Sequence, residues 1–488
     1  MSNVKNSIKS NIAYNSFYEV LIIIIPLIVS PYISRVLRTE GIGLYSFTFA
    51  VANYFKRAAM LGISKYGNRS IALVKEEEGL RRKRFWEIYT IQFISSFTCL
   101  LLYGCYLLLF NTRGASSYYQ ALFVLSSMFD VGWYYFGNEK FKPVIILNAI
   151  SKLLYLSLTF FFVRKIDDVN KYITIMALSY LIPNVILFAN VIIHVKLKIT
   201  FSLELKESLK GVLLLFIPVI AVTIYKSMDK LMLGIICETA YENGIYENAE
   251  KILHVPIAVI SAVSTVLMPR MTKLYRDKDN EKADSLMIST VRYAAFIGIA
   301  SAFGLAGVSE IFSNVYWGAG FEECAVLLTM FAISIPFMSF AEIIRTQYII
   351  PQKHDIIYIV AVCSGAVINF SINLLLIPFL GAEGAVIGTI VAETVVCVYQ
   401  AYKVTKFLPI RQYVREFIIY LMPGVIMYIF LRLFCTNVHH TIFNLVISVV
   451  FGACVYIFFS MVMLRFTHKE QYEHLKGLLI KILKLSRT

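Results

Sequence analysis

Hydrophobic residues in this 488-residue chain occur in long blocks, and this pattern constrains the fold more than any other feature. The blocks are about 20 residues long, which is the length an α-helix needs to cross a bilayer. Hydrophobic residues make up 58% of the chain and charged residues only 16%, a balance too apolar for a soluble domain. The sequence therefore predicts an all-α polytopic membrane protein, because helices satisfy their own backbone hydrogen bonds in hydrocarbon.

The spacing of the blocks predicts about fourteen transmembrane helices. The first block follows a polar, basic segment and is long enough to span, so we expect it to be retained rather than cleaved. The expected spans are residues 11–33, 42–63, 86–110, 117–137, 144–163, 172–195, 211–236, 245–268, 287–309, 322–347, 357–378, 384–405, 415–434 and 442–464.

Basic residues are distributed unequally between the two sets of loops. One set and the tail hold about thirty Lys and Arg and the other about six, and basic loops stay in the cytoplasm. We therefore expect cytoplasmic N- and C-termini. The net charge of +15 is explained by this topology and by anionic lipid headgroups, so nucleic acid is not an expected partner.

Motifs of soluble-type chemistry are absent from the sequence. There is no phosphate-binding glycine loop, zinc-type His pair or Gly-x-Ser-x-Gly elbow. The loops expected outside are short, which also argues against a glycosyltransferase or a repeat-unit polymerase. The sequence predicts a transporter rather than an enzyme, with no metal or other cofactor.

An internal repeat divides the chain. "IPLIVSPYISRVLRTEGIGLYSFTFAV", beginning at Ile25, is echoed by "IPVIAVTIYKSMDKLMLGII", beginning at Ile217. Such repeats let transporters build a binding site between two halves. We expect an N-terminal six-helix lobe at 1–200 and a C-terminal six-helix lobe at 201–410 around a central cavity, with two additional transmembrane helices and a basic cytoplasmic tail at 411–488.

Charged and polar residues within the spans recur on single helix faces, which must contact water or protein rather than lipid. Cations outnumber acids, so the predicted cavity would attract an anion such as phosphate or diphosphate. An alternative is that the charges form interhelical ion pairs, such as Asp229 with Lys251 or Lys230 with Glu250, that stabilise the bundle. The predicted substrate-binding cations are Lys56, Arg57, Lys226, Lys230, Lys251, Arg292, Arg35, Arg38 and Arg345; further polar cavity residues are Asn53, His254 and Lys152; and candidates for ion coupling or gating are Glu19, Asp130, Asp229, Glu250 and Glu342.

Asp130 lies in the aromatic, apolar stretch "FDVGWYYFGNEKFK" (residues 129–142). A buried carboxylate of this kind needs a partner. One interpretation is an ion pair with Lys152 that locks two helices together. The other is a titratable gate that couples ion movement to motion of the lobes.

Three stretches carry a family resemblance: "FDVGWYYFGNEKFKPVIILN", "YKSMDKLMLGI" followed by "GIYENAEKI", and "VLMPRMTKL". They resemble Wzx-type polysaccharide (O-antigen) flippases of the multidrug/oligosaccharidyl-lipid/polysaccharide exporter superfamily. The resemblance implies that an undecaprenyl-pyrophosphate-linked oligosaccharide repeat unit is flipped from the cytoplasmic to the outer leaflet of a bacterial inner membrane by alternating access, coupled to Na⁺ or H⁺.

The same resemblance implies membrane lipids, a polysaccharide polymerase and chain-length proteins as partners. Wzx members commonly have twelve spans, whereas lipid II flippases of this superfamily often have fourteen, the last two forming a groove for the lipid tail. A multidrug/cation antiporter of the same superfamily is the alternative function. It would need an apolar or acidic pocket, in contrast to the cationic cavity predicted here.

Overall fold

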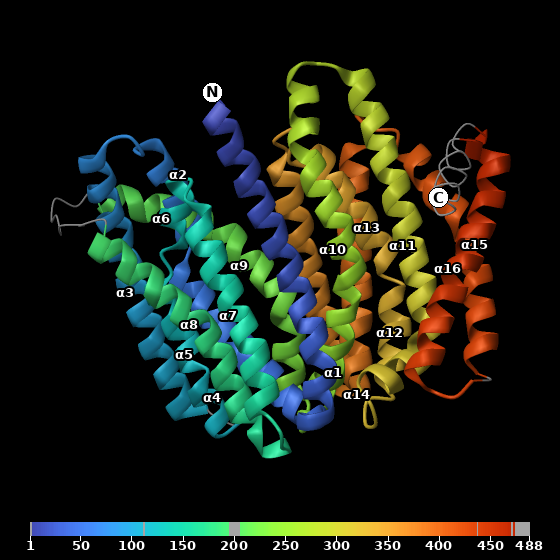
Figure 1. Ribbon diagram of the computed structural model, residues 1–488, viewed down its shortest axis with the longest axis horizontal. Coiled ribbons are helices and arrows are strands. Elements are labelled where there is room, and N and C mark those ends of the chain that lie inside the picture. The colour runs from blue at the N-terminus through green and yellow to red at the C-terminus, as the bar shows by residue number, and fades with distance from the viewer. Residues whose placement is uncertain (1, 111–112, 195–204, 437, 470–471, 474–488) are drawn as a thin grey trace, which may run out of the picture. The chain divides into compact units, whose positions relative to one another are not determined.

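The computed structural model describes the backbone of residues 2–110, 113–194, 205–436, 438–469 and 472–473, with the side chains of these residues except 2–20, 23, 194 and 218. Within these ranges the chain is helical and contains no β-strand (Figure 1). The prediction of an all-α fold is therefore confirmed.

The chain divides into two compact units, Met1–Glu247 and Asn248–Thr488. Helix α10 (Tyr241–Arg276) runs across this boundary, so its first turns belong to the first unit. The lobes expected at 1–200 and 201–410 follow from the sequence repeat, which is a different criterion from spatial compactness, and they remain a prediction.

The first unit is organised around α1, which packs against α3, α7 and α9. Helices α7 and α8 pack against each other, as do α2 and α6. Besides the start of α10, the elements are α1 (Ser2–Met60), α2 (Ile63–Leu73), α3 (Glu78–Phe110), α4 (Ala115–Tyr119), α5 (Ala121–Leu125), η1 (Ser126–Phe129), α6 (Gly132–Gly137), α7 (Phe141–Phe162), η2 (Ile166–Asp168), α8 (Val169–His194) and α9 (Leu205–Ile236).

The second unit is organised around α11, which contacts α12, α13, α15 and α16. Its elements after α10 are α11 (Asn280–Tyr316), α12 (Cys324–Ala332), α13 (Ile335–Ile344), the π-helix η3 (Arg345–Ile349), α14 (Asp355–Val404), α15 (Ile410–Cys435) and α16 (Ile442–Thr467).

Two long helices are each two expected spans joined without a loop. Helix α1 is broken at Arg38, with φ 59° and ψ −179°, and α14 is broken at Gly381, with φ 53° and ψ −128°. A positive φ carries no side-chain clash for glycine but costs a residue with a Cβ about 1–2 kcal/mol. The turn at Arg38 is therefore held by the packing around it rather than by local preference.

The span expected at 117–137 is not one helix. It consists of α4, α5, η1 and α6, with the backbone leaving helical geometry at Asp130 (φ −77°, ψ 84°). Irregular backbone at membrane depth is tolerated only where protein or water satisfies its polar groups. This break therefore marks an interior, polar part of the first unit.

Nine helices in the described part of the chain are long and apolar enough to cross a membrane. A bent pair, Cys324–Ala332 with Ile335–Ile349, makes a tenth with a 44° bend. Helix α14 counts once among the nine although it contains two expected spans, so the count of fourteen stays a prediction. A membrane protein of many spans is confirmed.

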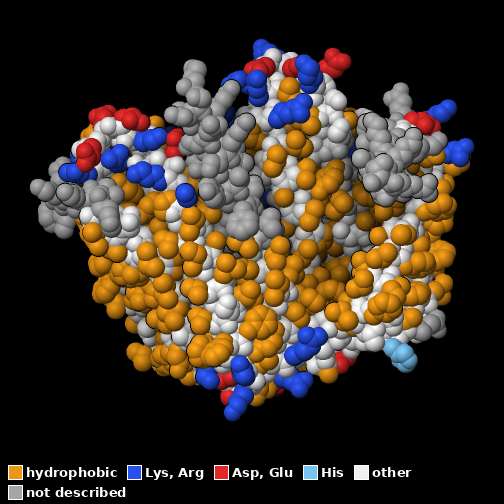
Figure 2. Space-filling model, in the orientation of Figure 1, with side chains coloured by type: hydrophobic (Ala, Val, Ile, Leu, Met, Phe, Trp, Pro, Cys, Tyr) orange, Lys and Arg blue, Asp and Glu red, His pale blue; other side chains and the backbone are white. Residues whose placement is uncertain are grey.

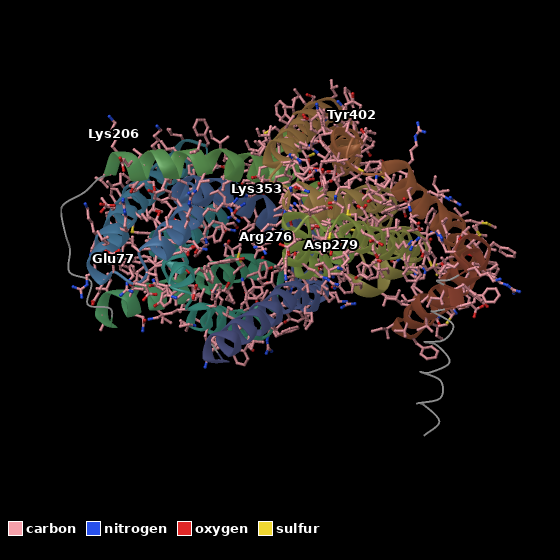
Figure 3. The ribbon with its side chains drawn as sticks, turned by 90° about the horizontal axis from the view of Figure 1, so that it is seen from above. Glu77, Lys206, Arg276, Asp279, Lys353 and Tyr402 are labelled. Carbon is pink, nitrogen blue, oxygen red and sulfur yellow. The ribbon has the colours of Figure 1, made fainter. Side chains whose placement is uncertain are left out.

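The surface has the distribution expected for a membrane-spanning bundle. Figure 2 shows a broad hydrophobic band, with Lys, Arg, Asp and Glu gathered near the ends of the helices. In the first unit, Glu77 and Lys206 lie at the end seen in Figure 3. We call this the proximal end of the unit, and the opposite end, where α3, α7 and α9 finish, the distal end.

An aromatic core fixes the proximal half of the first unit. Phe85, Trp133 and Tyr134 are buried there with Ile63 and Ile71. The Phe85 and Trp133 rings stack with centroids 5.5 Å apart. This core joins α2 and α6 to α3 and so holds the segment that follows the break at Asp130.

Gly67 of α2 is in close contact with this core and yields a testable prediction. A Cβ at Gly67 would lie 2.5 Å from Trp133 Cε3, whereas a Cβ at Gly79 would meet nothing within 4 Å. Overpacking costs about 1–3 kcal/mol, while Gly to Ala in an open helical site gains up to about 1 kcal/mol. We expect Gly67→Ala to lower the thermal unfolding midpoint of the detergent-solubilised protein and Gly79→Ala to preserve or raise it. Equal midpoints would contradict this packing.

Candidate functional site

Lys56 lies in the interior of the first unit, where α1 meets η1 and α8. Its Nζ donates a hydrogen bond to Ser126 Oγ at 2.9 Å. The same ammonium lies 4.2 Å from the centroid of the Phe123 ring and 4.7 Å from that of Tyr180. Ser126 is the first residue of η1, which packs against α1.

Lys152 approaches the same ring from α7. Its Nζ is 3.9 Å from the centroid of Tyr180 and 3.4 Å from Ser179 Oγ. Both ammonium groups therefore share the Tyr180 ring, and we call Lys56, Ser126, Lys152, Ser179 and Tyr180 the dilysine site. Among the described residues neither lysine is in an ion pair, and both are half-buried.

The positive charge of the dilysine site is not fully compensated by the protein. A cation–π contact is worth about 0.5–2 kcal/mol, whereas removing an ammonium from water costs several kcal/mol. Asp130 acts on Lys56 only at longer range. Two like charges sharing one ring in a membrane protein thus form a place where an anion would be stabilised.

Asp130 does not form the ion pair with Lys152 that was one interpretation of the sequence. Its Oδ1 accepts a hydrogen bond from the backbone N–H of Gly132 at 3.3 Å, and Lys152 contacts Tyr180 and Ser179 instead. A short acidic side chain bonding two residues ahead stabilises a turn. The structure thus gives Asp130 a local role at the helix break, and its predicted role as a gate remains a prediction.

Gln92 of α3 supports this break from the other side. Its Nε2 donates to Ser127 O at 2.7 Å and to Asp130 O at 3.0 Å, and its Oε1 accepts from Trp133 Nε1 at 2.9 Å. Gln92 is fully buried. One amide therefore satisfies carbonyls that the interrupted helix cannot satisfy itself.

The other predicted cations of the first unit are more exposed or already paired. Lys230 is in an ion pair with Glu247, with Nζ 2.6 Å from Oε2. Arg35 donates to the carbonyl of Pro31 at 3.4 Å. Exposed side chains are Arg35, Arg38, Arg57 and Lys226, and Asn53 is half-buried.

The predicted cations of the second unit are largely neutralised. Arg292 Nε lies 3.2 Å from Glu416 Oε1, and His468 Nε2 lies 3.2 Å from the other oxygen of that carboxylate. Arg345 pairs with Glu342 one helical turn earlier, and Ser261 Oγ donates to Glu342 Oε1 at 2.9 Å. These contacts reduce the cationic surplus that a count along the sequence suggests.

The remaining predicted residues are placed as follows. Asp229 is buried and accepts a 2.6 Å hydrogen bond from Tyr246 Oη. Glu250 lies 3.8 Å from the exposed His254, and Lys251 is half-buried. Glu19 lies outside the described side chains. No group of three or more His, Cys, Asp or Glu that could hold a metal ion occurs in the described part of the chain.

Sequence reasoning missed the partners that decide the role of each charge. Tyr180 lies in an apolar stretch of α8, so nothing in its sequence context indicates that two lysines share its ring. Glu416 lies near the start of α15, outside the repeat, and was not expected to neutralise Arg292. Glu247, the partner of Lys230, was not among the residues predicted from the sequence.

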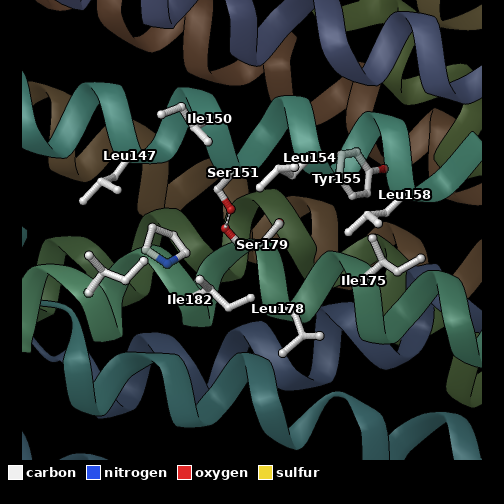
Figure 4. Close-up of a pocket in the computed structure, with 12 residues that line it drawn as sticks. Leu147, Ile150, Ser151, Leu154, Tyr155, Leu158, Ile175, Leu178, Ser179 and Ile182 are labelled. Atoms are coloured by element: carbon white, nitrogen blue, oxygen red, sulfur yellow. Dashed lines mark hydrogen bonds between the residues drawn. The ribbon is translucent and has the colours of Figure 1, made fainter.

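Two pockets are bounded mainly by apolar side chains. One of about 140 Å³ lies between α7 and α8, with Ser151 donating to the Ser179 carbonyl at 2.8 Å in its wall (Figure 4). Because Ser179 also contacts Lys152, this pocket borders the dilysine site. The second, of about 460 Å³, is in the second unit between α11, α13 and α15.

Two family models match the chain, each over more than half of its length. The model described as polysaccharide biosynthesis protein matches residues 8–275. The model described as lipid II flippase MurJ matches residues 155–450.

Named relatives have low identity to this chain, and two of them match over most of its length. A "Putative O-antigen transporter" of Shigella dysenteriae is 24% identical over 396 residues, which are 77% of this chain and 94% of that protein. One of the same name from Escherichia coli K12 is 22% identical, covering 69% of this chain and 82% of that protein. A "Probable lipid II flippase MurJ" of Rickettsia prowazekii is 25% identical, covering 35% of this chain and 33% of that protein.

Solved structures share the fold. A lipid II flippase MurJ in an inward closed conformation has a TM-score of 0.69 at 17% identity, covering 93% of this chain and 98% of that one. An inward-facing MATE family transporter has a TM-score of 0.58 at 12% identity, covering 80% and 99%. Two function classes therefore share this architecture, and side chains must distinguish between them.

The hydrogen bonds of Gln92 generate a stability prediction. Gln92→Leu removes three bonds from a fully buried site, and a buried polar group left unpaired costs about 1–3 kcal/mol. We expect a lower thermal midpoint and lower abundance than for Gln412→Leu, a change of the same size at an exposed position. Trp133→Phe should lower stability in the parent, where it removes the bond to Gln92, and should lower it less in Gln92→Leu, where the indole N–H is already unpaired. Equal effects in both backgrounds would contradict the coupling.

Proposed function

Because the chain belongs to the polysaccharide biosynthesis protein family, as a Wzx-type flippase of the multidrug/oligosaccharidyl-lipid/polysaccharide exporter superfamily, we propose that it translocates an undecaprenyl-diphosphate-linked oligosaccharide repeat unit. The transfer runs from the cytoplasmic to the outer leaflet by alternating access. The protein is a multi-pass membrane transporter rather than an enzyme, and the bacterial inner membrane is its location.

The dilysine site is the observation that carries this proposal. A diphosphate supplies several anionic oxygens, and Lys56 and Lys152 supply two ammonium groups without a carboxylate in contact. Ser126 and Ser179 add hydroxyls beside them. Charge-assisted hydrogen bonds of this type are the strong ones. A cationic drug would meet repulsion at the same place, which favours a lipid-linked glycan over a drug.

The direction and coupling of transport are part of the proposal. The proximal end of the first unit carries the basic α2–α3 region, so we place it in the cytoplasm and the distal end outside. Na⁺ or H⁺ would supply the driving force, acting on one of the acids Glu19, Asp130, Asp229, Glu250 or Glu342. The substrate would enter and leave within the bilayer, because its polyprenyl chain remains in hydrocarbon.

Neutralising the dilysine site should impair transport. We expect Lys56→Met and Lys152→Met each to lower surface polysaccharide about ten-fold or more, because a charge-assisted bond is worth about 1.5–3 kcal/mol. Lipid-linked repeat units should accumulate on the inner leaflet of a strain that has this protein as its only flippase. Lys65→Met is the control, because Lys65 is exposed on α2.

The same variants separate substrate classes. The purified parent should bind undecaprenyl diphosphate much more tightly than undecaprenol, and the Lys56→Met/Lys152→Met double variant should lose that preference. Normal surface polysaccharide in the double variant at parental abundance would refute the role of the site. Transport of a cationic dye in preference to the lipid-linked glycan would favour the drug antiporter instead.

Asp130→Asn tests the proposed gating role of the Asp130 charge while keeping the hydrogen bond that supports the local fold. The asparagine Oδ1 can still accept the hydrogen bond from Gly132 but carries no charge. We expect reduced translocation at unchanged abundance and an altered dependence on the Na⁺ or H⁺ gradient. Unchanged translocation and abundance would leave Asp130 with only its local contact at the helix break.

A further inference from the structure

A third pocket lies at the distal end of the first unit, between α1, α3 and α9. Its volume is about 750 Å³, which exceeds that of either pocket described above. Each of the three helices packs against the other two. All of the lining residues fall within 47–238, so the pocket belongs to one compact unit, and none of them is part of the dilysine site. We call it the distal pocket.

The interior of the distal pocket is apolar, whereas its rim carries charge. Val51 and Phe55 of α1 and Leu231 of α9 line the interior, together with aromatic side chains of α3. Arg113 and Glu238 line the rim, just beyond the ends of α3 and α9. A site with charges at one end and an apolar interior has the polarity of an amphiphile, with its head group at the distal end.

Contacts between the walls keep the distal pocket formed without a ligand. Arg113 donates from Nη2 to the carbonyl oxygen of Gly234 at 2.8 Å, and its Cζ lies 5.4 Å from the centroid of the Phe47 ring. Gly43 leaves no room for a Cβ beside the Ala240 carbonyl, so α1 directly touches the α9–α10 hairpin. A pre-formed pocket is typical of a binding site for a small molecule.

The lining residues at the mouth of the distal pocket indicate access from the bilayer. Phe110 and Ile235 both line it, and they are 64% and 67% exposed although both are large and apolar. In a membrane protein such side chains contact acyl chains. An acyl chain that moves into the pocket stays in an apolar environment and gains dispersion contacts with the aromatic walls. A membrane lipid is therefore the expected occupant.

The charges at the rim select among lipid head groups. The Arg113 guanidinium matches the geometry of a phosphate, and Glu238 is an exposed acid at the same rim. A second acid, Glu242 of α10, lies close enough to act with Arg113 on the lining residue Cys237. These acids would repel a purely anionic head group. A head group with a phosphate and an ammonium group is attracted by both kinds of charge.

We propose that the distal pocket binds one molecule of phosphatidylethanolamine. One acyl chain lies between Phe55 and Leu231, the phosphate contacts Arg113, and the ammonium group contacts Glu238. With the distal end outside the cell, this lipid belongs to the outer leaflet. It is a bound ligand rather than the transported cargo, so the site is additional to the proposed flippase function and can be tested without transport.

The test uses two photoreactive lipids in vesicles that contain the purified full-length protein. One is a phosphatidylethanolamine and the other a phosphatidylglycerol, each with a diazirine in one acyl chain, and the vesicles hold both lipid classes in equal parts. Crosslinks of the first lipid should map to the lining residues of α1, α3 and α9. Arg113→Met should lower its crosslinking about five-fold or more, because charge-assisted bonds to the phosphate are lost. Glu238→Lys should reverse the preference in favour of phosphatidylglycerol.

Further variants separate lipid binding from a general loss of structure. Arg164→Met and Glu40→Gln change exposed charges that do not line the distal pocket, and they should leave crosslinking unchanged. Arg113→Lys keeps the positive charge and should retain most of the crosslinking that Arg113→Met loses. Leu231→Trp fills the interior but leaves both rim charges in place, so it should lower the crosslinking of both lipids.

The outcomes are distinguishable at normal protein abundance. Crosslinks at the lining residues together with a reversed preference in Glu238→Lys support the site. Crosslinks spread over the lipid-facing surface and unaffected by every variant would overturn it. Unchanged crosslinking in Arg113→Met with increased binding of a lipophilic cationic dye would also overturn it, because the pocket would then take a cation. None of these measurements involves transport, so a failure of the proposed flippase function leaves the result intact.

Discussion

A charged side chain that enters hydrocarbon must find a counter-charge, a hydrogen-bond partner or water, and this requirement organises the structure. Several charges in the spans find such a partner within the protein. Lys230 forms an ion pair with Glu247, and Arg292 forms one with Glu416. Lys56 and Lys152 are compensated only in part, by hydroxyls and aromatic rings. The difference between complete and partial compensation separates charges that hold helices together from charges able to receive a ligand.

The helix breaks follow from the same requirement applied to the backbone. The interruption at Asp130 leaves carbonyls outside a regular helix, and the buried Gln92 amide supplies their donors. Ser126, one helical turn before the interruption, accepts the hydrogen bond from Lys56. A break that would be costly in a lipid-facing helix is thus tolerated in the interior of the first unit, close in sequence to Ser126 of the dilysine site.

The sequence predicted the features that depend on local composition. Long apolar blocks specify helices in a membrane, so the all-α polytopic class was predicted correctly, and most expected spans coincide with observed helices. The motifs around Asp130 and Asp229 pointed to the polysaccharide flippases, which the family models bear out. Candidate charges were also found, because charge in an apolar block is conspicuous in any sequence. Their roles as substrate or coupling residues remain predictions.

Which side chain compensates each charge could not be predicted from the sequence, because that depends on distances between residues far apart in the chain. The sequence by itself determined that this protein is a helical membrane transporter with charges in its spans, since hydrophobicity and charge are properties of each residue. Tertiary structure alone decided that Glu416 neutralises Arg292, that Tyr180 is shared by Lys56 and Lys152, and that Gly43 touches the α9–α10 hairpin. Whether a charge is compensated depends on what lies within a few ångströms of it, and only folding sets that distance.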